Sequence, residues 1–366
     1  MKILQVNKLY YPWLGGIETV VQNIAEDLNK ENNFQVDVLV CQAKGRRKIE
    51  TINNTKVYRA TSWGKKLGMP ISWDFFRLFL KIHKEYDVII IHHPFPLVFL
   101  ILPFIKDKNI FIWYHSDIVR QKIAKKIFTP FISHGLNKAK KIFVSSNNLI
   151  NNSSSLKRRK NKCISIPFGV DLNYFTANEE IEQEAEVIKN KYGKPLLLSV
   201  GRLVYYKGYQ YLIEAMKNVD AHLLIIGQGP LKKELSRAIE ENKLNNKISI
   251  ISPVNDLRPF YLSSDLLVLP SCEKSEAFGL VQIEAMAYSK PIINTSLPTG
   301  VPEISMHKEN GITVPPKDSK ALGEAINTII NNEMLKNRYG QESRKRVETI
   351  FNRRIFNDKL TKELNR

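Results

Sequence analysis

Short apolar runs alternate with helical patterns along nearly the whole chain, and this alternation restricts the fold more than any other feature. Patterns with helical spacing, such as 209–217 and 231–241, follow the apolar runs. We predict strands at 3–6, 36–40, 88–91, 110–113, 142–144, 196–198, 223–226, 248–251, 266–269 and 292–293. Strands that alternate with helices at this spacing form a parallel sheet with helices on both faces. The predicted fold class is therefore α/β, with doubly wound parallel sheets.

The length of the chain predicts two domains. With 366 residues and 43% hydrophobic composition, the chain exceeds what one core usually supports. Pro167 and Gly169 break the pattern directly after a charged run, so we predict domains at 1–172 and 173–366. Two such domains would face each other across a cleft, with ligands outside the carboxyl ends of the strands. The charged helical segment at about 346–366 is expected to pack back on the first domain.

The cysteines and the apolar segments favour a protein of the reducing cytoplasm. Cys41, Cys163 and Cys272 are far apart and form no C-x-x-C pair, which argues against a disulfide framework and against a zinc site. The apolar run within residues 1–7 is too short for the hydrophobic region of a signal peptide. The most apolar segment, 95–105, contains two prolines and falls short of the roughly 20 residues that span a bilayer, so we expect a core helix there.

The formal net charge of +19 is concentrated in the first half. Residues 1–172 hold 28 Lys and Arg against 12 Asp and Glu, a net +16, whereas the remainder holds 27 against 24, a net +3. This excess favours an anionic partner for the first half, either membrane lipid headgroups or nucleic acid. The alternative is a lysine-rich solvated surface.

Two segments of the first half are candidates for a basic amphipathic surface. The lysines of 122–126 have helical spacing, and the segment 73–81 combines aromatic, aliphatic and basic side chains. Packing of Phe76 and Leu80 into the core explains the apolar part of 73–81 equally well.

The loop at 201–208, with the sequence GRLVYYKG, follows a predicted strand and carries Arg202 and Lys207. Breaking the bond between a sugar and a nucleotide diphosphate builds negative charge on the diphosphate, which a metal, cationic side chains or backbone N–H groups must balance. The chain contains no D-x-D sequence, which would be the usual acidic clamp for a metal. We therefore predict that Arg202 and Lys207 bind an anion, although a single Arg and Lys after a strand are more often ordinary solvated charges.

A second strand-to-helix turn, 275–284, has the sequence SEAFGLVQIE. If its strand is parallel to the one before Arg202, both turns lie at the same edge of the sheet. The N–H groups of residues 278–280 would then form an anion site at a helix N-terminus. Glu284 is predicted to accept hydrogen bonds from a ribose diol, and Glu276 to reach the transferred sugar. The alternative roles are a helix cap for Glu276 and a surface position for Glu284.

The first half contributes two further candidates. Gly15 and Gly16 follow the first predicted strand and open a helix, where glycine lets the backbone approach a phosphate closely. An ordinary loop would explain them as well. His115 ends a predicted strand at the carboxyl edge of the sheet, where it would face the cleft and contact substrate. A structural role is the alternative for this histidine.

Two other functions are possible from the residues alone. The charge would suit a nucleic-acid-binding protein, but no recognised module of that kind is present. The turn at 227–230, GQGP, resembles part of a dinucleotide fingerprint, which would suit an NAD-dependent enzyme. It lacks the third glycine and the acidic residue about 20 positions further on.

Taken together, these segments resemble retaining glycosyltransferases of family 4. The matching segments are GGIE at 15–18, HSDIV at 115–119, GRLVYYKG at 201–208, SEAFG at 275–279 and EAMA at 284–287. Their order and spacing match the family over nearly the whole chain. The pattern of two glutamates separated by seven residues is specific, and the loop with Arg and Lys adds to it.

The resemblance implies a GT-B fold, in which two Rossmann-like domains take the acceptor in the first half and the sugar nucleotide in the second. It implies two catalytic residues, His115 and Glu276, both at the transferred sugar. It implies these donor-binding residues: Arg202 and Lys207 at the diphosphate, Glu284 at the ribose, Gly16 at a phosphate, and the amides of Phe278, Gly279 and Leu280 at the donor sugar and phosphates. No metal cofactor is expected. The departing phosphate would help to deprotonate the acceptor hydroxyl on the same face of the sugar.

The versions HSDIV and VYYKG are most similar to a bacterial branch that adds mannose or a related hexose to O-antigen or exopolysaccharide chains. The resemblance therefore implies a mannosyltransferase with GDP-mannose as donor and a lipid-linked oligosaccharide or polysaccharide as acceptor. It implies a cytoplasmic enzyme that is peripheral to the inner membrane, bound through the basic first domain, and no nucleic-acid partner.

Overall fold

The computed structural model describes residues 1–366 except 14, 67–68, 107–108, 119–121 and 194, and except the side chains of 122–126. The chain divides into two compact units, one formed by Met1–Ile166 with Asn357–Arg366 and the other by Pro167–Phe356. The division lies a few residues before residue 172, because Phe168 packs edge-to-face on Phe278 within the second unit.

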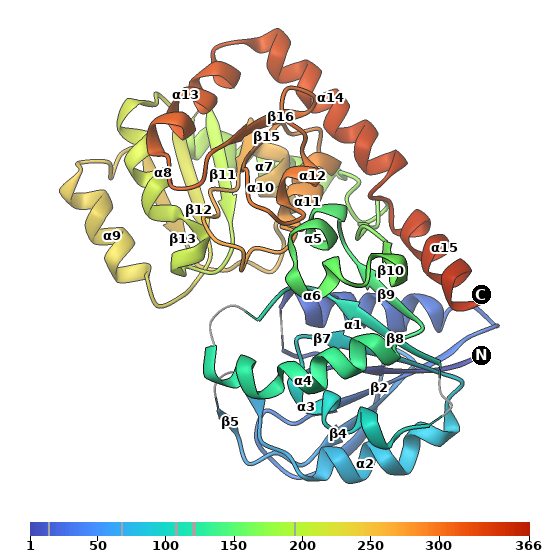
Figure 1. Ribbon diagram of the computed structural model, residues 1–366. Helices are drawn as coiled ribbons and strands as arrows, with labels where there is room; N and C mark the ends of the chain where they lie inside the picture. Colours follow the sequence, from blue (N-terminus) through green and yellow to red (C-terminus); the bar gives the residue numbers. More distant parts are fainter. Residues whose placement is uncertain (14, 67–68, 107–108, 119–121, 194) are drawn as a thin grey trace. The chain divides into compact units, whose positions relative to one another are not determined.

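The first unit contains an eight-stranded sheet with the order β10-β9-β8-β7-β1-β2-β4-β3 (Figure 1). Its strands are β1 Lys2–Val6, β2 Gln35–Cys41, β3 Lys48–Ile52, β4 Thr55–Ala60, β7 Val88–His93, β8 Asn109–Tyr114, β9 Lys141–Val144 and β10 Cys163–Ser165. All neighbours pair in parallel except β3 and β4, and a separate antiparallel pair is formed by β5 Lys65–Lys66 and β6 Met69–Pro70. The five strands predicted for this half are confirmed.

The hairpin of β3 and β4 and the edge strand β10 were not predicted. β3 is a partly exposed edge strand that carries charged residues, so it lacks the apolar run of a central strand. Asn53 and Asn54 join β3 to β4 with φ of 46° and 62°, the left-handed conformation typical of a two-residue hairpin turn. β10 has only three residues, all half-buried, and gives a similarly weak signal.

The helices of the first unit are α1 Gly16–Leu28, α2 Asp74–Ile82, α3 Pro96–Phe99, α4 Lys122–Lys138, α5 Asn147–Asn152 and α6 Ser154–Lys157, with short 3₁₀ turns η1 His83–Glu85, η2 Leu102–Phe104 and η3 Lys160–Lys162. The expectation of one continuous core helix at 95–105 was wrong. Pro103 cannot continue a helix, and the segment consists of α3 and η2. Phe99 and Leu102 lie in the core as expected, but Phe104 is 77% exposed.

The second unit contains a six-stranded sheet, all parallel, with the order β13-β12-β11-β14-β15-β16. Its strands are β11 Leu196–Val200, β12 His222–Ile226, β13 Ile248–Ile251, β14 Leu266–Val268, β15 Ile292–Thr295 and β16 Gly311–Val314. Five were predicted, and the sixth, β16, begins with glycine and is only partly buried, so it gives no apolar run. The α/β fold class is therefore confirmed.

Two groups of helices pack around this sheet. The helices are α7 Glu179–Tyr192, α8 Tyr209–Ala215, α9 Lys232–Glu241, α10 Arg258–Ser263, α11 Val281–Ala287, α12 Val301–Ile304, α13 Ser319–Ile330 and α14 Glu333–Thr349, with the 3₁₀ turns η4 Tyr205–Lys207 and η5 Met216–Asn218. The last helix of the chain is α15 Arg353–Leu364. α8 contacts α9 and α13, whereas α10 contacts α7 and α11. No helix in the described part of the chain is long and apolar enough to cross a bilayer.

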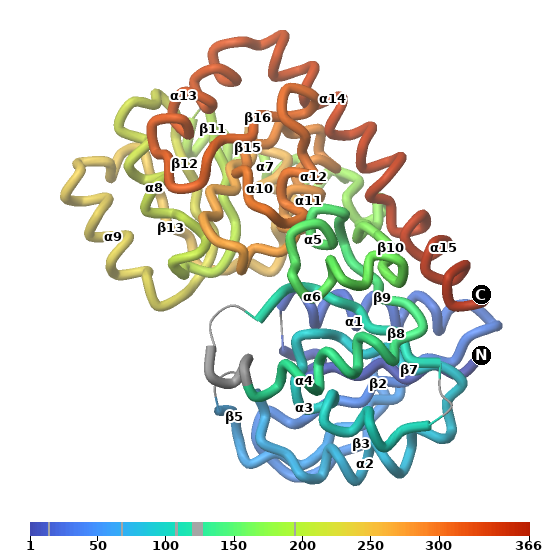
Figure 2. Tube along the Cα trace, viewed as in Figure 1, coloured from blue at the N-terminus to red at the C-terminus, as the bar shows by residue number. Residues whose placement is uncertain are grey.

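The last residues of the chain belong to the first unit, so α15 begins in one unit and ends in the other. Asn357 Nδ2 donates a hydrogen bond to Asp27 Oδ2 at 3.0 Å. Figure 2 follows the trace to a C-terminus that lies, like the N-terminus, in this unit.

The order of the strands creates a switch point at the centre of the second unit. β11 pairs with β12 on one side and with β14 on the other, and both pairings are parallel. The loops that leave the carboxyl ends of β11 and β14 therefore start next to each other. In open α/β sheets this is the position where ligands bind.

Glycines let the loops at this edge approach closely. Gly208 has φ of +74°, and a Cβ there would lie 2.0 Å from the carbonyl oxygen of Pro270, in the loop after β14. At Gly227 and Gly229 a Cβ would lie 1.9 Å and 2.3 Å from the carbonyl oxygens of Gly201 and Leu203. The glycines of the 227–230 turn thus fit against the loop that carries Arg202.

We predict that Gly208→Ala destabilises the protein by about 2–5 kcal/mol. Gly208 is left-handed, with φ of 74° and ψ of 17°, and alanine in that conformation costs about 1–2 kcal/mol. The overlap of the new Cβ with the carbonyl oxygen of Pro270 adds about 1–3 kcal/mol. Urea unfolding measures the loss, and a loss of less than about 2 kcal/mol, which backbone strain alone would explain, would contradict the close approach of the two loops.

Candidate functional site

The two loops of the switch point meet through one ion pair. Lys207 ends η4 in the loop after β11, and Glu276 lies in the loop after β14. Lys207 Nζ is 2.6 Å from Glu276 Oε2, and the N–H of Cys272 donates to the carbonyl oxygen of Tyr206 at 2.8 Å. Two of the predicted site residues, 69 positions apart in the sequence, are therefore in direct contact.

This ion pair is largely removed from water. The side chains of Lys207 and Glu276 are 11% and 10% exposed, and Ser271 Oγ donates to Glu276 Oε2 at 2.9 Å. Burial alone would lower the pKa of Lys207, but the charge of Glu276 and its hydrogen bond raise that pKa above its ordinary value. The ammonium group is therefore charged at neutral pH despite its burial.

Glu284 lies in α11 and belongs to the same cluster. Tyr261 in α10 donates its hydroxyl to Glu284 Oε2 at 2.5 Å. Burial raises the pKa of Glu284, whereas the bond from Tyr261 and the positive charge of Lys207 oppose that rise. The apolar neighbours of Glu284 in the helix, Ile283 and Ala285, are fully buried as expected. The charge of Lys207 thus acts on the carboxylates of both Glu276 and Glu284.

Arg202 starts from the same edge of the sheet, but its side chain is exposed. Among the described residues, no hydrogen-bond acceptor or carboxylate pairs with its guanidinium group. Its backbone is fixed, because the neighbouring Leu203 N–H donates to the carbonyl oxygen of Gln228 at 2.9 Å. The structure therefore anchors the loop of Arg202 beside Lys207 and leaves the guanidinium group available to a ligand.

The turn before α11 presents backbone donors. In the described part of the chain, no acceptor takes the N–H groups of Phe278, Gly279 and Leu280. Gly279 has φ of +84°, and a Cβ there would lie 2.7 Å from Leu269 Cδ2. Phe278 is buried against Phe168, with the ring centroids 5.2 Å apart. The alternative role of Glu276 as a cap does not hold, because Leu280 is the N-cap of α11 and no side chain caps this helix by a hydrogen bond among the described residues.

His115 in the first unit follows β8 and is buried in a chain of hydrogen bonds. His115 Nε2 is 2.9 Å from His92 Nδ1, and His92 Nε2 is 2.9 Å from Gln5 Oε1. Gln5 Nε2 donates to the carbonyl oxygen of Val21, which fixes the orientation of the amide. Burial lowers the pKa of His115 well below its ordinary value, and the neighbouring His92 and His93 lower it further.

These contacts define which nitrogens carry hydrogen. Gln5 Oε1 only accepts, so His92 must donate from Nε2. Burial lowers the pKa of His92 to about 3, so its ring is neutral and its Nδ1 accepts from His115 Nε2. Neutral His115 therefore carries its hydrogen on Nε2, and its Nδ1 is the acceptor nitrogen of the ring.

Gly16 is the first residue of α1, and Gly15 is its N-cap in extended conformation. A Cβ on Gly16 would meet no atom of a described residue within 4 Å, whereas one on Gly15 would lie 2.4 Å from Glu18 Oε2. The space at Gly16 is compatible with close approach of a ligand to the backbone. The role of Gly16 at a phosphate stays a prediction.

Sequence reasoning missed the residues that hold the predicted ones in place. Tyr261 belongs to no recognisable motif and precedes β14, so nothing marks it as the partner of Glu284. Ser271 lies three residues after the end of β14, and a polar residue so near the carboxyl end of a strand was a usable signal. His92 lies in an apolar strand, β7, whose pattern gave no sign of a functional residue. Within the described residues, no group of three or more His, Cys, Asp or Glu could hold a metal ion.

Two family models match the chain one after the other. The model described as Glycosyltransferase Family 4 matches residues 14–174, and the model described as Glycosyl transferases group 1 matches residues 180–346. The chain is 31% identical to O-antigen chain mannosyltransferase C of Escherichia coli, over 96% of this chain and 94% of that protein. It is 28% identical to D-rhamnosyltransferase WbpZ of Pseudomonas aeruginosa, over 96% of this chain and 92% of that protein.

Solved structures share the fold over the whole chain. Sucrose-phosphate synthase of Thermosynechococcus elongatus has a TM-score of 0.82 at 22% identity, covering 100% of this chain and 98% of that chain. HepE of Anabaena, solved in complex with UDP, has a TM-score of 0.82 at 18% identity and covers 100% of both chains. The predicted GT-B fold is thereby confirmed.

We predict that Glu276→Ala lowers the free energy of unfolding by about 3 kcal/mol, because it leaves the buried ammonium group of Lys207 without its partner. Glu273→Ala is the matched control, since Glu273 lies in the same loop and forms no ion pair with any described residue. Urea unfolding at pH 7 measures both variants. If Glu276→Ala lowers the free energy of unfolding no more than Glu273→Ala does, the ion pair of Lys207 and Glu276 is not buried.

We also predict that the protein loses stability as the pH falls from above 6.5 towards 4. Burial lowers the pKa of His92 to about 3 and that of His93 to about 4, and lowers that of His115 as well. The unfolded chain binds protons on these rings below pH 6.5, so unfolding takes up protons there and becomes easier. His92→Gln should reduce the slope of the free energy of unfolding against pH by about 1.4 kcal/mol per pH unit.

Urea unfolding at several pH values measures this slope. His134→Gln is the control, because His134 is an exposed histidine of the same unit. An unchanged slope in His92→Gln, or an equal change in His134→Gln, would refute the buried neutral chain of histidines.

Proposed function

We propose that this chain, which belongs to glycosyltransferase family 4, moves a hexose from a nucleotide diphosphate sugar to an acceptor with retention of the anomeric configuration. The observation that carries the proposal is the cluster of Lys207, Glu276 and Glu284 at the switch point between β11 and β14. Ligands of open α/β sheets bind at this position. In this proposal the second unit takes the donor and the first unit takes the acceptor.

Lys207 and Arg202 supply the positive charge for the leaving diphosphate. An ammonium group has three donors, so Lys207 can keep its bond to Glu276 and still donate to a phosphate oxygen. Glu276 offsets the charge of Lys207, so the guanidinium group of Arg202, which has no carboxylate partner among the described residues, provides the net positive charge. The N–H groups of residues 278–280, which no described residue accepts, add donors at the same edge. This arrangement stabilises the developing charge with side chains and backbone of this chain.

Glu284 suits the role of ribose ligand. Tyr261 occupies Oε2, whereas Oε1 accepts no hydrogen bond from any described residue. A carboxylate oxygen in a poorly hydrated place is a strong acceptor for a hydroxyl group. The bond from Tyr261 fixes the orientation of the carboxylate before the ligand arrives, which reduces the entropy lost on binding.

Glu276, His115 and Gly16 complete the proposed machinery. Glu276 would contact the transferred sugar, and its position is fixed by Lys207 and Ser271. His115, held neutral and with Nε2–H directed to His92, would contact a sugar hydroxyl, and Gly16 would admit a phosphate close to the backbone. For retention, the departing phosphate takes the proton of the acceptor hydroxyl as the new bond forms on the same face of the sugar.

We further propose GDP-mannose as donor and a lipid-linked or polysaccharide acceptor of surface-glycan biosynthesis. The mannosyltransferase of Escherichia coli and the rhamnosyltransferase of Pseudomonas aeruginosa, both matched over nearly their whole length, support this choice. The UDP in the HepE structure supports UDP-glucose or another UDP-sugar as the competing donor. The net +16 of residues 1–172 supports a cytoplasmic enzyme peripheral to an anionic membrane.

The relatives and the solved structures support neither alternative function. The relatives and solved structures named above are not described as nucleic-acid-binding proteins or as NAD-dependent enzymes. The glycines of the 227–230 turn fit against the carbonyl oxygens of Gly201 and Leu203, so close packing accounts for them without a dinucleotide.

We predict that Arg202→Gln and Glu284→Gln each weaken binding of GDP-mannose by about tenfold or more, because each removes a charge-assisted hydrogen bond. Isothermal titration against GDP-mannose measures the affinity. Arg237→Gln is the control, since Arg237 is an exposed arginine of α9 that pairs only with Glu241 among the described residues. Full affinity and full transfer activity in both test variants would contradict the proposed site.

Thermal shift of the wild-type protein identifies the donor. A ligand that binds only the folded state raises the melting temperature, and the rise increases with the ratio of ligand concentration to Kd. GDP and GDP-mannose should raise it more than UDP and UDP-glucose at equal concentration. A larger rise with UDP or UDP-glucose would contradict GDP-mannose as the donor, but it would still agree with a glycosyltransferase.

A further inference from the structure

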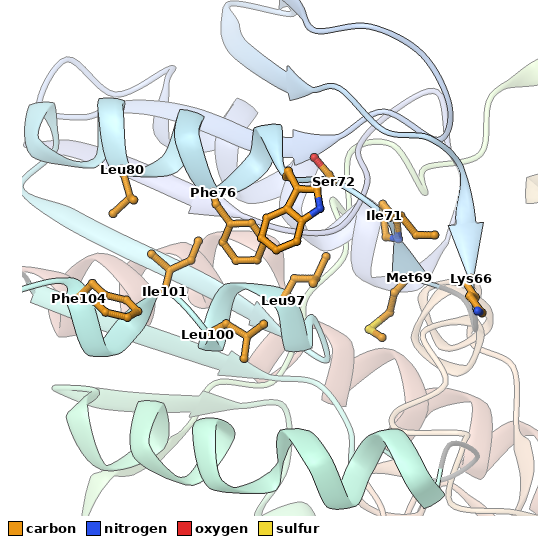
Figure 3. Close-up of a pocket in the computed structure, with 12 residues that line it drawn as sticks. Lys66, Met69, Ile71, Ser72, Phe76, Leu80, Leu97, Leu100, Ile101 and Phe104 are labelled. Atoms are coloured by element: carbon orange, nitrogen blue, oxygen red, sulfur yellow. The ribbon is translucent and has the colours of Figure 1, made fainter.

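An apolar groove lies on the first unit, and none of the candidate site residues lines it. It is lined by side chains of α2, of α3 and η2, and of the β5–β6 pair, and it encloses about 580 Å³. Figure 3 shows Phe76 and Leu80 on one side and Leu97, Ile101 and Phe104 on the other. Of the twelve lining residues, Lys66 and Ser72 alone have polar side chains.

The helix α2 is more apolar than the core requires. Phe75, Leu78 and Phe79 are residues that it buries in the core. Phe76 and Leu80, four positions apart and hence on one side of the helix, line the groove, and Phe76 also packs against the core. Packing of these two residues in the core, which was one interpretation of the segment 73–81, is wrong for Leu80, because Leu80 is 44% exposed.

The rim of the groove exposes large aromatic side chains. Trp73 is 70% exposed and Phe104 is 77% exposed. Isolated exposed apolar residues are common, but a contiguous patch around a hollow marks an interaction site. Tryptophan in particular is enriched where one end of a side chain lies in hydrocarbon and the other in water.

The charges at the groove are positive. Lys66 lines it, Lys65 and Lys81 are exposed next in sequence to the lining residues Lys66 and Leu80, and no carboxylate is among its lining residues. Asp74, at the start of α2, is already paired with Arg47. An apolar patch flanked by lysines matches the structure of an anionic lipid surface, in which phosphates lie above hydrocarbon.

We infer that this groove docks the chain on a membrane, with Trp73 and Phe104 inserted at the boundary between headgroups and acyl chains and the groove occupied by lipid hydrocarbon. This inference rests on the proposed function, which requires access to an acceptor at a membrane, and it assigns the contact to named residues. Charge complementarity selects the occupant. A second copy of the chain would bring the same lysines face to face, which opposes a symmetric dimer through this patch.

Vesicle co-sedimentation tests the inference with the full chain. Vesicles of phosphatidylcholine alone are compared with an equal mixture of phosphatidylcholine and phosphatidylglycerol. The wild-type protein should bind the mixed vesicles more tightly. The double variant Trp73→Ser, Phe104→Ser should bind them at least about tenfold more weakly, because two large side chains no longer enter hydrocarbon.

A second double variant tests the charge. Lys66→Gln with Lys81→Gln should weaken binding to the mixed vesicles by about fivefold for each lysine and should leave binding to pure phosphatidylcholine unchanged. The control is Val187→Ser with Met334→Ser, because these two residues of the second unit are 66% and 83% exposed. The control should bind vesicles as the wild-type protein does.

Three outcomes would overturn the inference. The first is that the wild-type protein does not bind the mixed vesicles, and the second is that the Trp73 and Phe104 variant binds them fully while keeping the wild-type melting temperature. The third is concentration-dependent dimerisation that the same variant abolishes, which would assign the groove to a second copy. The vesicle assay contains no sugar nucleotide. Vesicle binding without any response to GDP-mannose or UDP-sugars would therefore reject the proposed function and leave the docking surface intact.

Discussion

The parallel pairing of β11 with β14 is the constraint on which the candidate donor site depends. It places two loops, separated by 69 positions at Lys207 and Glu276, at one edge of the sheet. The buried ion pair then joins the loops, and the left-handed Gly208 lets them approach to a distance that no other residue would permit without strain. A site built on strand ends of a rigid sheet holds its charges in position before any ligand binds.

Buried titratable groups are charged in the second unit and neutral in the first. In the second unit, a buried lysine stays charged because Glu276 compensates its desolvation. In the first unit, burial keeps His115, His92 and His93 neutral, and a directed chain of hydrogen bonds fixes the hydrogen on His115 Nε2. A charged lysine suits an anionic diphosphate, whereas a neutral imidazole suits a hydroxyl group. Both states follow from burial together with the immediate partner of each group.

Much of the fold was predictable from the sequence because buried parallel strands appear as continuous apolar runs. That signal predicted most of the central strands of both sheets, and it failed where strands lie at or near an edge, as in β3, β10 and β16. Pro103 was visible in the sequence, yet its effect on 95–105 was underestimated. The candidate site residues were recognisable as charged residues after strands. The residues that hold them in place, Tyr261 and His92, could not be recognised. They are remote in sequence from the groups they bind and follow no spacing rule.

The central claim is that Lys207, Arg202 and Glu284 hold a single nucleotide diphosphate sugar at the switch point of the second unit. A crystal structure with GDP-mannose or GDP bound tests this claim most directly. We expect diphosphate oxygens within hydrogen-bond distance of Lys207 Nζ and of the N–H groups of residues 278–280, and ribose hydroxyls at the carboxylate of Glu284. A nucleotide bound elsewhere, with the pair of Lys207 and Glu276 untouched, would contradict the claim.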